Sequence, residues 1–215
     1  GRVLVFGSNI DLSNAQIDVS GQTGGGTVTI GNAITNNSSN IPAIYQWENA
    51  SNLRVSRHTR ISARARENGS GGNVAIRSDR LDVSGHIDAR GAGSGRGGSV
   101  EVSGSGRFSG SVDLSGENGN LGRVQVRAEN IAINSDDTSN ASASQLTVPE
   151  TTVENLTTRA EVIMEANNDI AIENLSDDRL NFNQNSHNNS HNNGHNNNPN
   201  NNPNNNYRYR SALPP

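Results

Sequence analysis

The sequence contains no cysteine and no lysine, and only 3% of its 215 residues are aromatic, with a single tryptophan. Without cysteine the chain can form neither disulfides nor cysteine-ligated zinc sites, and thiol chemistry is excluded. It has no run of 18 apolar residues, so no membrane-spanning helix is predicted. Val, Ile, Leu and Phe together number 43, one fifth of the chain, which is close to the composition of disordered proteins. Either the chain is largely disordered, or its few apolar residues lie in a thin and regular core.

Charge does not favour an expanded chain. The 17 basic residues, all arginine, nearly balance 21 acidic residues and leave a net charge of −4. The sequence begins at Gly1, and its first residues already have the apolar pattern of a strand instead of a charged and apolar leader. We therefore expect a piece of a longer, processed protein.

A repeat of about 25 residues dominates the sequence. One motif recurs in four places: Ile17-Asp18-Val19-Ser20, Ile61-Ser62-Ala63-Arg64, Ile87-Asp88-Ala89-Arg90 and Val112-Asp113-Leu114-Ser115. Each copy leads through a glycine-rich turn to a second motif, as in Val74-Ala75-Ile76, Val100-Glu101-Val102 and Val124-Gln125-Val126.

Three short strands with alternating apolar residues fit into each repeat, for example 74–76, 81–83 and 87–89. Strands this short cannot form an independent sheet, but they suit a parallel β-helix, in which each coil pairs with the next at about 4.8 Å. Such a fold needs only a thin column of Val, Ile and Leu. The sequence therefore predicts an all-β parallel β-helix with about 25 residues per coil.

Two segments interrupt the repeat, at 31–52 and 134–159, and we predict that they form loop insertions. The first contains Tyr45 and Trp47, which are candidate contact residues because loops on one face of a repeat protein often bind partners. The alternative is that both aromatic rings pack down over a coil.

Residues 183–215 form a low-complexity tail that consists mainly of Asn, with His187, His191 and His195 at intervals of four. Because it has almost nothing to bury, we predict that the tail is disordered and acts as a spacer after the domain at 1–182. Weak metal capture by its histidines is the alternative, but the Asn background and the prolines disfavour the helix that would align them.

Four segments resemble the filamentous haemagglutinin-like adhesins, which are two-partner-secretion exoproteins of Gram-negative bacteria, especially the long cyanobacterial members. They are ARENGSGGNVAI (65–76), SGHIDARGAGSGRGGSVEVSG (84–104), GSVDLSGENGNLGRVQV (110–126) and LTVPETTVENLTTRAEVIMEANNDIAIENLSDDRLNF (146–182). The resemblance implies a right-handed β-helix that is exported by a dedicated outer-membrane β-barrel transporter. The Asn/His tail departs from it, as does Arg127-Ala128-Glu129-Asn130-Ile131, where the family often has an Asp-Pro-x-Asn-Ile turn.

Asp18, Asp88 and Asp113 occupy the middle of the first motif, and stacked coils would place Asp88 and Asp113 one coil apart. Two close carboxylates can bind a cation or act as an acid/base pair on a polysaccharide. The alternative is that the middle of a strand must be polar and that Asp before Ser-Gly favours a turn. We expect no enzyme activity, no cofactor and no metal site.

Arginine is concentrated between residues 54 and 107, where stacking would gather several guanidinium groups. Such a patch can hold sulfated or acidic glycans through charge-assisted contacts. Nucleic acid is a poorer candidate, since no aromatic residues are interleaved as stacking platforms. The alternative is that the arginines pair singly with nearby acids on a solvated face. The candidate contacts for an anionic glycan are Arg57, Arg60, Arg64 and Arg66.

These observations predict a secreted or cell-surface, outer membrane-associated adhesin stalk that attaches to cells or surface glycans. The alternative is a fragment of a glycan-active β-helical lyase or hydrolase.

Overall fold

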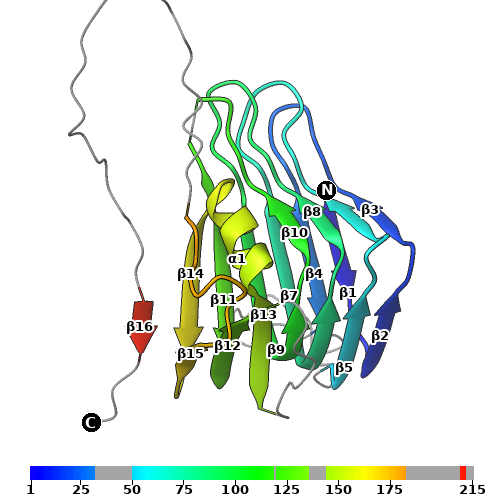
Figure 1. Cartoon of the computed structure of the whole chain (residues 1–215). Coiled ribbons are helices and arrows are strands. Elements are labelled where there is room, and N and C mark those ends of the chain that lie inside the picture. Colours follow the sequence, from blue (N-terminus) through cyan, green and yellow to red (C-terminus); the bar gives the residue numbers. More distant parts are fainter. Residues whose placement is uncertain (32–49, 119, 136–143, 183–208, 212–215) are drawn as a thin grey trace, which may run out of the picture.

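The computed structural model describes residues 1–31, 50–118, 120–135, 144–182 and 209–211. This part of the chain consists mostly of strands, and all pairings between them are parallel (Figure 1). The prediction of an all-β protein with parallel strands is confirmed. The elements are β1 (Arg2–Val5), β2 (Asn9–Leu12), β3 (Gln16–Asp18), β4 (Thr27–Gly31), β5 (Asn52–Val55), β6 (Arg60–Ser62), β7 (Asn73–Val83), β8 (His86–Asp88), β9 (Ser99–Phe108), β10 (Ser111–Asp113), β11 (Gly122–Ala128), β12 (Asn130–Asn134), β13 (Gln145–Pro149), α1 (Glu150–Thr157), β14 (Ala160–Ala166), β15 (Ile170–Ile172) and β16 (Tyr209–Ser211).

The strands form three faces. The first face contains β1, β4, the first part of β7 and β9, then β11, β14 and β16. The second face contains β2, β5, the last part of β7 and β9, then β13, β12 and β15. The third face is the four-stranded sheet of β3, β6, β8 and β10.

The pairing register follows the sequence repeat. On the third face, Ile17 pairs with Ile61, Ile61 with Ile87, and Ile87 with Val112. On the first face, Val74 pairs with Val100 and Val100 with Val124. Because the side chains of a strand alternate between its two sides, these equivalent residues lie in continuous rows. The apolar rows are buried and form one hydrophobic core, as the alternating pattern predicts.

Paired glycines let the chain return from the third face to the first. The second glycine of each pair donates its N–H to a carbonyl just after the third-face strand, as from Gly72 to Ala63 and from Gly98 to Ala89, both at 2.7 Å. The first glycine lies against the next repeat: a Cβ on Gly71 would be 1.8 Å from the carbonyl oxygen of Ala89. The glycine-rich turns of the repeat are thus places where two backbones touch.

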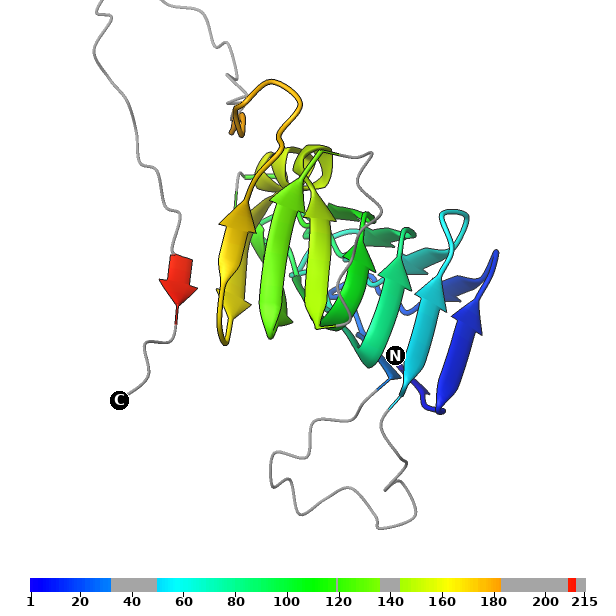
Figure 2. The same ribbon diagram turned by 60° about the horizontal axis from the view of Figure 1, so that its bottom comes forward.

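The segment 134–159, predicted as a loop, contains a strand and a helix. β13 enters the second face between β9 and β12, although it follows β12 in the chain (Figure 2). Pro149 ends this strand, since proline has no N–H to continue the ladder. Helix α1 follows, and Val153 and Leu156, three residues apart, bury its apolar side. The loop prediction is wrong for residues 145–157, while 136–143 lie outside the described residues.

Helix α1 packs near β10 and β14, where a further third-face strand would otherwise follow (Figure 1).

The segment after β15 is attached to helix α1 by hydrogen bonds. The carboxylate of Glu150, buried at the start of α1, accepts hydrogen bonds from the N–H and hydroxyl of Ser176, and that of Glu154 accepts one of 2.7 Å from the N–H of Asn181. Leu175, Leu180 and Phe182 pack against the core.

The structure describes little of the predicted loop insertion at 31–52 and of the predicted tail at 183–215. Residues 32–49 of the first insertion, and with them Tyr45 and Trp47, lie outside the described residues. Of the tail at 183–215 only β16 is described, where it pairs with β14, and disorder of the tail stays a prediction. No helix in the described ranges is long and apolar enough to cross a membrane.

Candidate functional site: the outer side of the third face

The outward residues of the third face form three polar rows, and the predicted arginine contacts lie in and beside them. The strand registers and the hydrogen bonds that continue beyond the strands define these rows. The first row is Gln16, Arg60, His86 and Ser111; the second is Asp18, Ser62, Asp88 and Asp113; the third is Ser20, Arg64, Arg90 and Ser115. The predicted alignment of Asp18, Asp88 and Asp113 at equivalent positions is therefore present.

Each aspartate of the second row closes a turn at the end of its strand. Its Oδ1 accepts the N–H of the residue two positions later, at 2.8 Å for Asp18, 3.2 Å for Asp88 and 3.1 Å for Asp113. This is the Asx-turn geometry that aspartate favours at chain reversals. The turn interpretation of these residues accounts for their position without any ligand.

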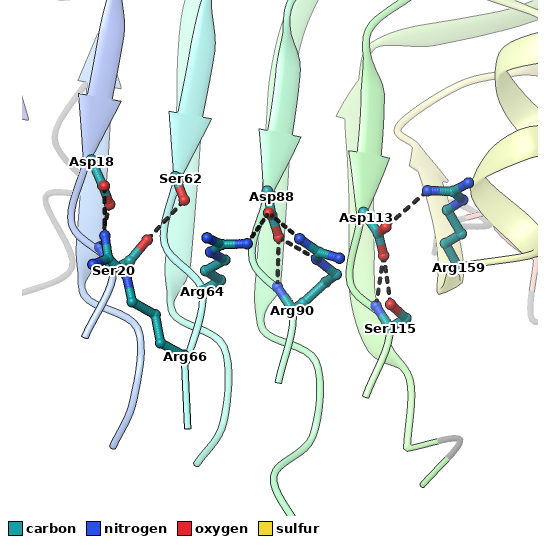
Figure 3. A network of polar contacts seen from close by, with 10 residues as sticks. All are labelled: Asp18, Ser20, Ser62, Arg64, Arg66, Asp88, Arg90, Asp113, Ser115 and Arg159. Atoms are coloured by element: carbon teal, nitrogen blue, oxygen red, sulfur yellow. Dashed lines mark hydrogen bonds and ion pairs between the residues drawn. The ribbon is translucent and has the colours of Figure 1, made fainter. Parts of the chain in front are cut away.

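Each aspartate also contacts a guanidinium group (Figure 3). Arg66 lies 2.9 Å from Asp18, and Arg90 holds Asp88 through two hydrogen bonds of 2.9 and 2.8 Å. Arg64 stands 3.9 Å from Asp88 on its other side. Arg159, just beyond α1, reaches Asp113 at 2.8 Å. A row that looks acidic in the sequence is therefore neutralised in the fold.

Two of these carboxyl groups are held in the ionised form. The pKa of Asp18 is lowered by hydrogen bonds from the side chain and backbone of Ser20 and by the charges of Arg66 and Arg64. Burial alone would raise the pKa of Asp88, but hydrogen bonds from Arg90 and the charges of Arg90 and Arg64 outweigh burial, so this pKa is also lowered. The same contact with Asp88 raises the pKa of Arg90.

This electrostatic arrangement bears on the acid/base hypothesis. A general acid needs a carboxyl group whose pKa is raised, whereas those of Asp18 and Asp88 are lowered. Guanidinium groups already balance the charge of these carboxylates, which a bound cation would otherwise do. Within the described ranges, no group of three or more acidic or histidine side chains is placed to hold a metal ion.

We predict that Asp88→Asn lowers the free energy of unfolding by about 1–3 kcal/mol at neutral pH, because the amide cannot balance Arg90 and Arg64. The pKa of Asp88 is lower in the folded state, so the stabilisation is present above the unfolded pKa of about 4 and is lost as the pH falls through the folded pKa. The difference between wild type and variant should shrink in acid. Urea denaturation at several pH values measures it.

Asp79→Asn is the matched control, because Asp79 is exposed and its carboxylate has no ion pair among the described residues. It should change stability little at any pH. An Asp88→Asn penalty that stays constant down to strongly acidic pH would contradict this role for the carboxylate.

The four predicted arginine contacts differ in how they are engaged. Arg64 and Arg66, after β6, are paired with aspartates. Arg57, in the turn before β6, and Arg60, at its first position, are exposed and have no ion pair within the described residues. The four arginines thus follow one another along β6 and its flanking turns, and among them only Arg57 and Arg60 form no ion pair with a described residue.

A second charged ladder, on the outer side of the first face, was not found from the sequence. Glu101 contacts Arg77 and, at 3.7 Å, Arg127, while Glu165 lies 2.7 Å from Arg127. Arg77, Arg127 and Glu165 share one outward row of the register, while Glu101 lies in the adjacent row, opposite Ala75 and Gln125. The recurrence of opposite charges at about the repeat interval, from Arg77 to Glu101 and on to Arg127, is the signal that could have identified them. Cross-strand pairs of opposite charge stabilise sheet pairing modestly.

No family model matches the sequence, and a search of curated proteins finds none that matches it.

Proposed function

We propose that the described strands belong to a right-handed parallel β-helix, and that the chain is a segment of a secreted or surface-bound adhesin stalk of the filamentous haemagglutinin type. The observation that carries this proposal is the register: each of the first four repeats adds one strand to each of three faces, with equivalent residues paired. Right-handed crossover connections between parallel strands are the rule in proteins, which supports the handedness.

A stalk of this kind acts through geometry. Each repeat needs only its neighbours, so length increases with the number of repeats while the outer rows remain free to contact a surface. Export through an outer-membrane transporter and attachment to cells or surface glycans follow from the resemblance in the quoted segments. The paired and ionised carboxylates of the third face favour attachment over the glycan-active alternative.

Attachment to anionic glycans should depend on Arg57 and Arg60. We expect Arg57→Ser/Arg60→Ser to bind a heparin-coated surface at least about tenfold more weakly than wild type, since two charge-assisted contacts are lost. Adding Arg64→Ser and Arg66→Ser should weaken binding further. Surface plasmon resonance at several salt concentrations measures this loss, and raised salt should reduce wild-type binding.

Arg123→Ser/Arg127→Ser is the matched control. It removes the same charge from the first face, where both arginines are paired with glutamates. It should leave heparin binding nearly unchanged. Equal binding by wild type and the variant with all four substitutions would end the assignment of an anionic ligand to this region.

A further inference from the structure

A groove with polar side chains along both walls crosses the outer side of the second face. It has a volume of about 590 Å³, within the range of ligand sites, and spans β2, β5, β7 and β9. One wall is a row of outward side chains in register: Asn9, Asn52, Arg80 and Ser105. The other wall is formed by Asp11, Arg54 and Asp82.

The backbone between the two walls forms the floor of the groove. At the β9 end of the floor, no side chain can replace the glycine and fill the groove. Gly106 has a φ of +113°, and a Cβ there would lie 2.2 Å from the carbonyl oxygen of Leu81. Its neighbour Ser105 is small and is held by a hydrogen bond of 2.6 Å to the carbonyl of Asp79. The groove is therefore a fixed feature of these strands.

The groove lining has no net charge, because its two arginines, Arg54 and Arg80, balance its two aspartates, Asp11 and Asp82. Arg54 and Asp11 are 3.9 Å apart, and their side chains are 59% and 60% exposed, so this is a loose pair. Arg80 and Asp82 are exposed and form no ion pair with any described residue. Asn52 donates a hydrogen bond of 2.9 Å to Asn9, which orders the two amides.

We propose that this groove binds a linear, uncharged oligosaccharide. Sugar hydroxyls both donate and accept hydrogen bonds, and the groove offers carboxylate acceptors, guanidinium donors and amides that do both. A polymer of uniform charge would gain nothing from a neutral lining. Four strands at about 4.8 Å spacing make a track about 14 Å long, which suits an extended chain of several sugar units.

Among the described residues that line the groove there is no aromatic ring on which a sugar could stack, so affinity depends on hydrogen bonds and is weak for one groove. Similar grooves repeated along a stalk would act together, because linked sites raise the effective concentration of ligand. The proposal deepens the attachment function but uses different residues from the anionic contact, so either can fail while the other stands.

Saturation-transfer NMR and calorimetry with cellotetraose, maltotetraose and laminaritetraose test the proposal on the whole chain. We expect at least one of these neutral sugars to bind, and a heparin tetrasaccharide not to compete for its site. Arg80→Gln and Asp82→Asn should each weaken binding about tenfold, since each removes one charged hydrogen-bonding group while keeping its approximate size.

Arg123→Gln and Glu161→Gln are the controls, because they remove the same charges from an exposed pair on the first face. They should leave sugar binding unchanged, and circular dichroism establishes that all four variants fold. The proposal is overturned if no neutral sugar binds, or if the groove and control variants bind equally. Cleavage of the bound sugar would also overturn it in favour of the glycan-active alternative. Loss of heparin binding in Arg57→Ser/Arg60→Ser with sugar binding retained separates the two sites.

Discussion

Gly97→Ala is expected to destabilise the protein by about 3 kcal/mol or more, even though it adds a single methyl group. The new Cβ would lie 1.7 Å from the carbonyl oxygen of Leu114 and 2.5 Å from the N of Gly122. Both atoms belong to the backbone of the next repeat, so no side-chain rotation can relieve the overlap. The two repeats would have to separate, and the ladders on every face would be disturbed with them.

Gly24→Ala is the control, because it makes the same substitution at a glycine without a close backbone contact. Gly24 lies in the equivalent kind of glycine-rich turn, but the nearest atom to its added Cβ would be the carbonyl oxygen of Ser70 at 3.7 Å, an ordinary contact. Urea denaturation followed by circular dichroism compares the two variants. We expect Gly24→Ala to stay within about 0.5 kcal/mol of wild type. Similar losses for both variants would show that the contact between repeats is not the reason for glycine at 97.

Phe108→Ala should have the largest effect among core substitutions, about 3–5 kcal/mol. Phe108 ends β9 and is the bulkiest of the fully buried side chains in the part of the chain that the structure describes. It stands in register with Val83 of the previous repeat. Removing the ring leaves a cavity. Each face contributes only one layer of inward side chains to the core, so few neighbours can move in to fill that cavity.

Thermal and urea denaturation measure this loss, and Leu4→Ala is the comparison. Leu4 is also apolar and also in a strand, but it is 41% exposed on the outer side of β1. Leu4→Ala should lower the free energy of unfolding by well under 1.5 kcal/mol, since folding removes little of the Leu4 side chain from water. If Phe108→Ala were no more destabilising than Leu4→Ala, the core described for this fold would be wrong at β9.

The sequence alone predicted the strands best where one repeat resembles the next. Ile61, Ile87 and Val112 were aligned from their spacing, and these are the residues that pair. The prediction failed at β13 and α1, where no repeat guides the alignment. β13 does carry the alternation Leu146-Thr147-Val148, but its place between β9 and β12 depends on contacts with both strands, which its own residues do not reveal.

The candidate site shows a different limit. The arginine cluster was visible in the sequence, but the sequence could not show which guanidinium groups are neutralised. Asp113 is paired with Arg159, which lies 46 residues away and reaches it only because α1 packs beside β10. The groove on the second face was not anticipated either, because its two walls are formed by residues of four strands that look unremarkable one at a time.

The insertion of β13 has a consequence for how such a chain can change over evolutionary time. A complete extra strand lies in the second face, yet Val100, Val124 and Val162 on the first face remain in unbroken register beside it. Every strand of a parallel stack presents the same pattern of backbone N–H and C=O groups to its neighbour. An inserted strand of suitable length can therefore pair on both sides without altering the strands around it. Duplication or deletion of whole repeats would leave matching edges in the same way, which allows gene rearrangements to change the length of the molecule while its cross-section stays constant.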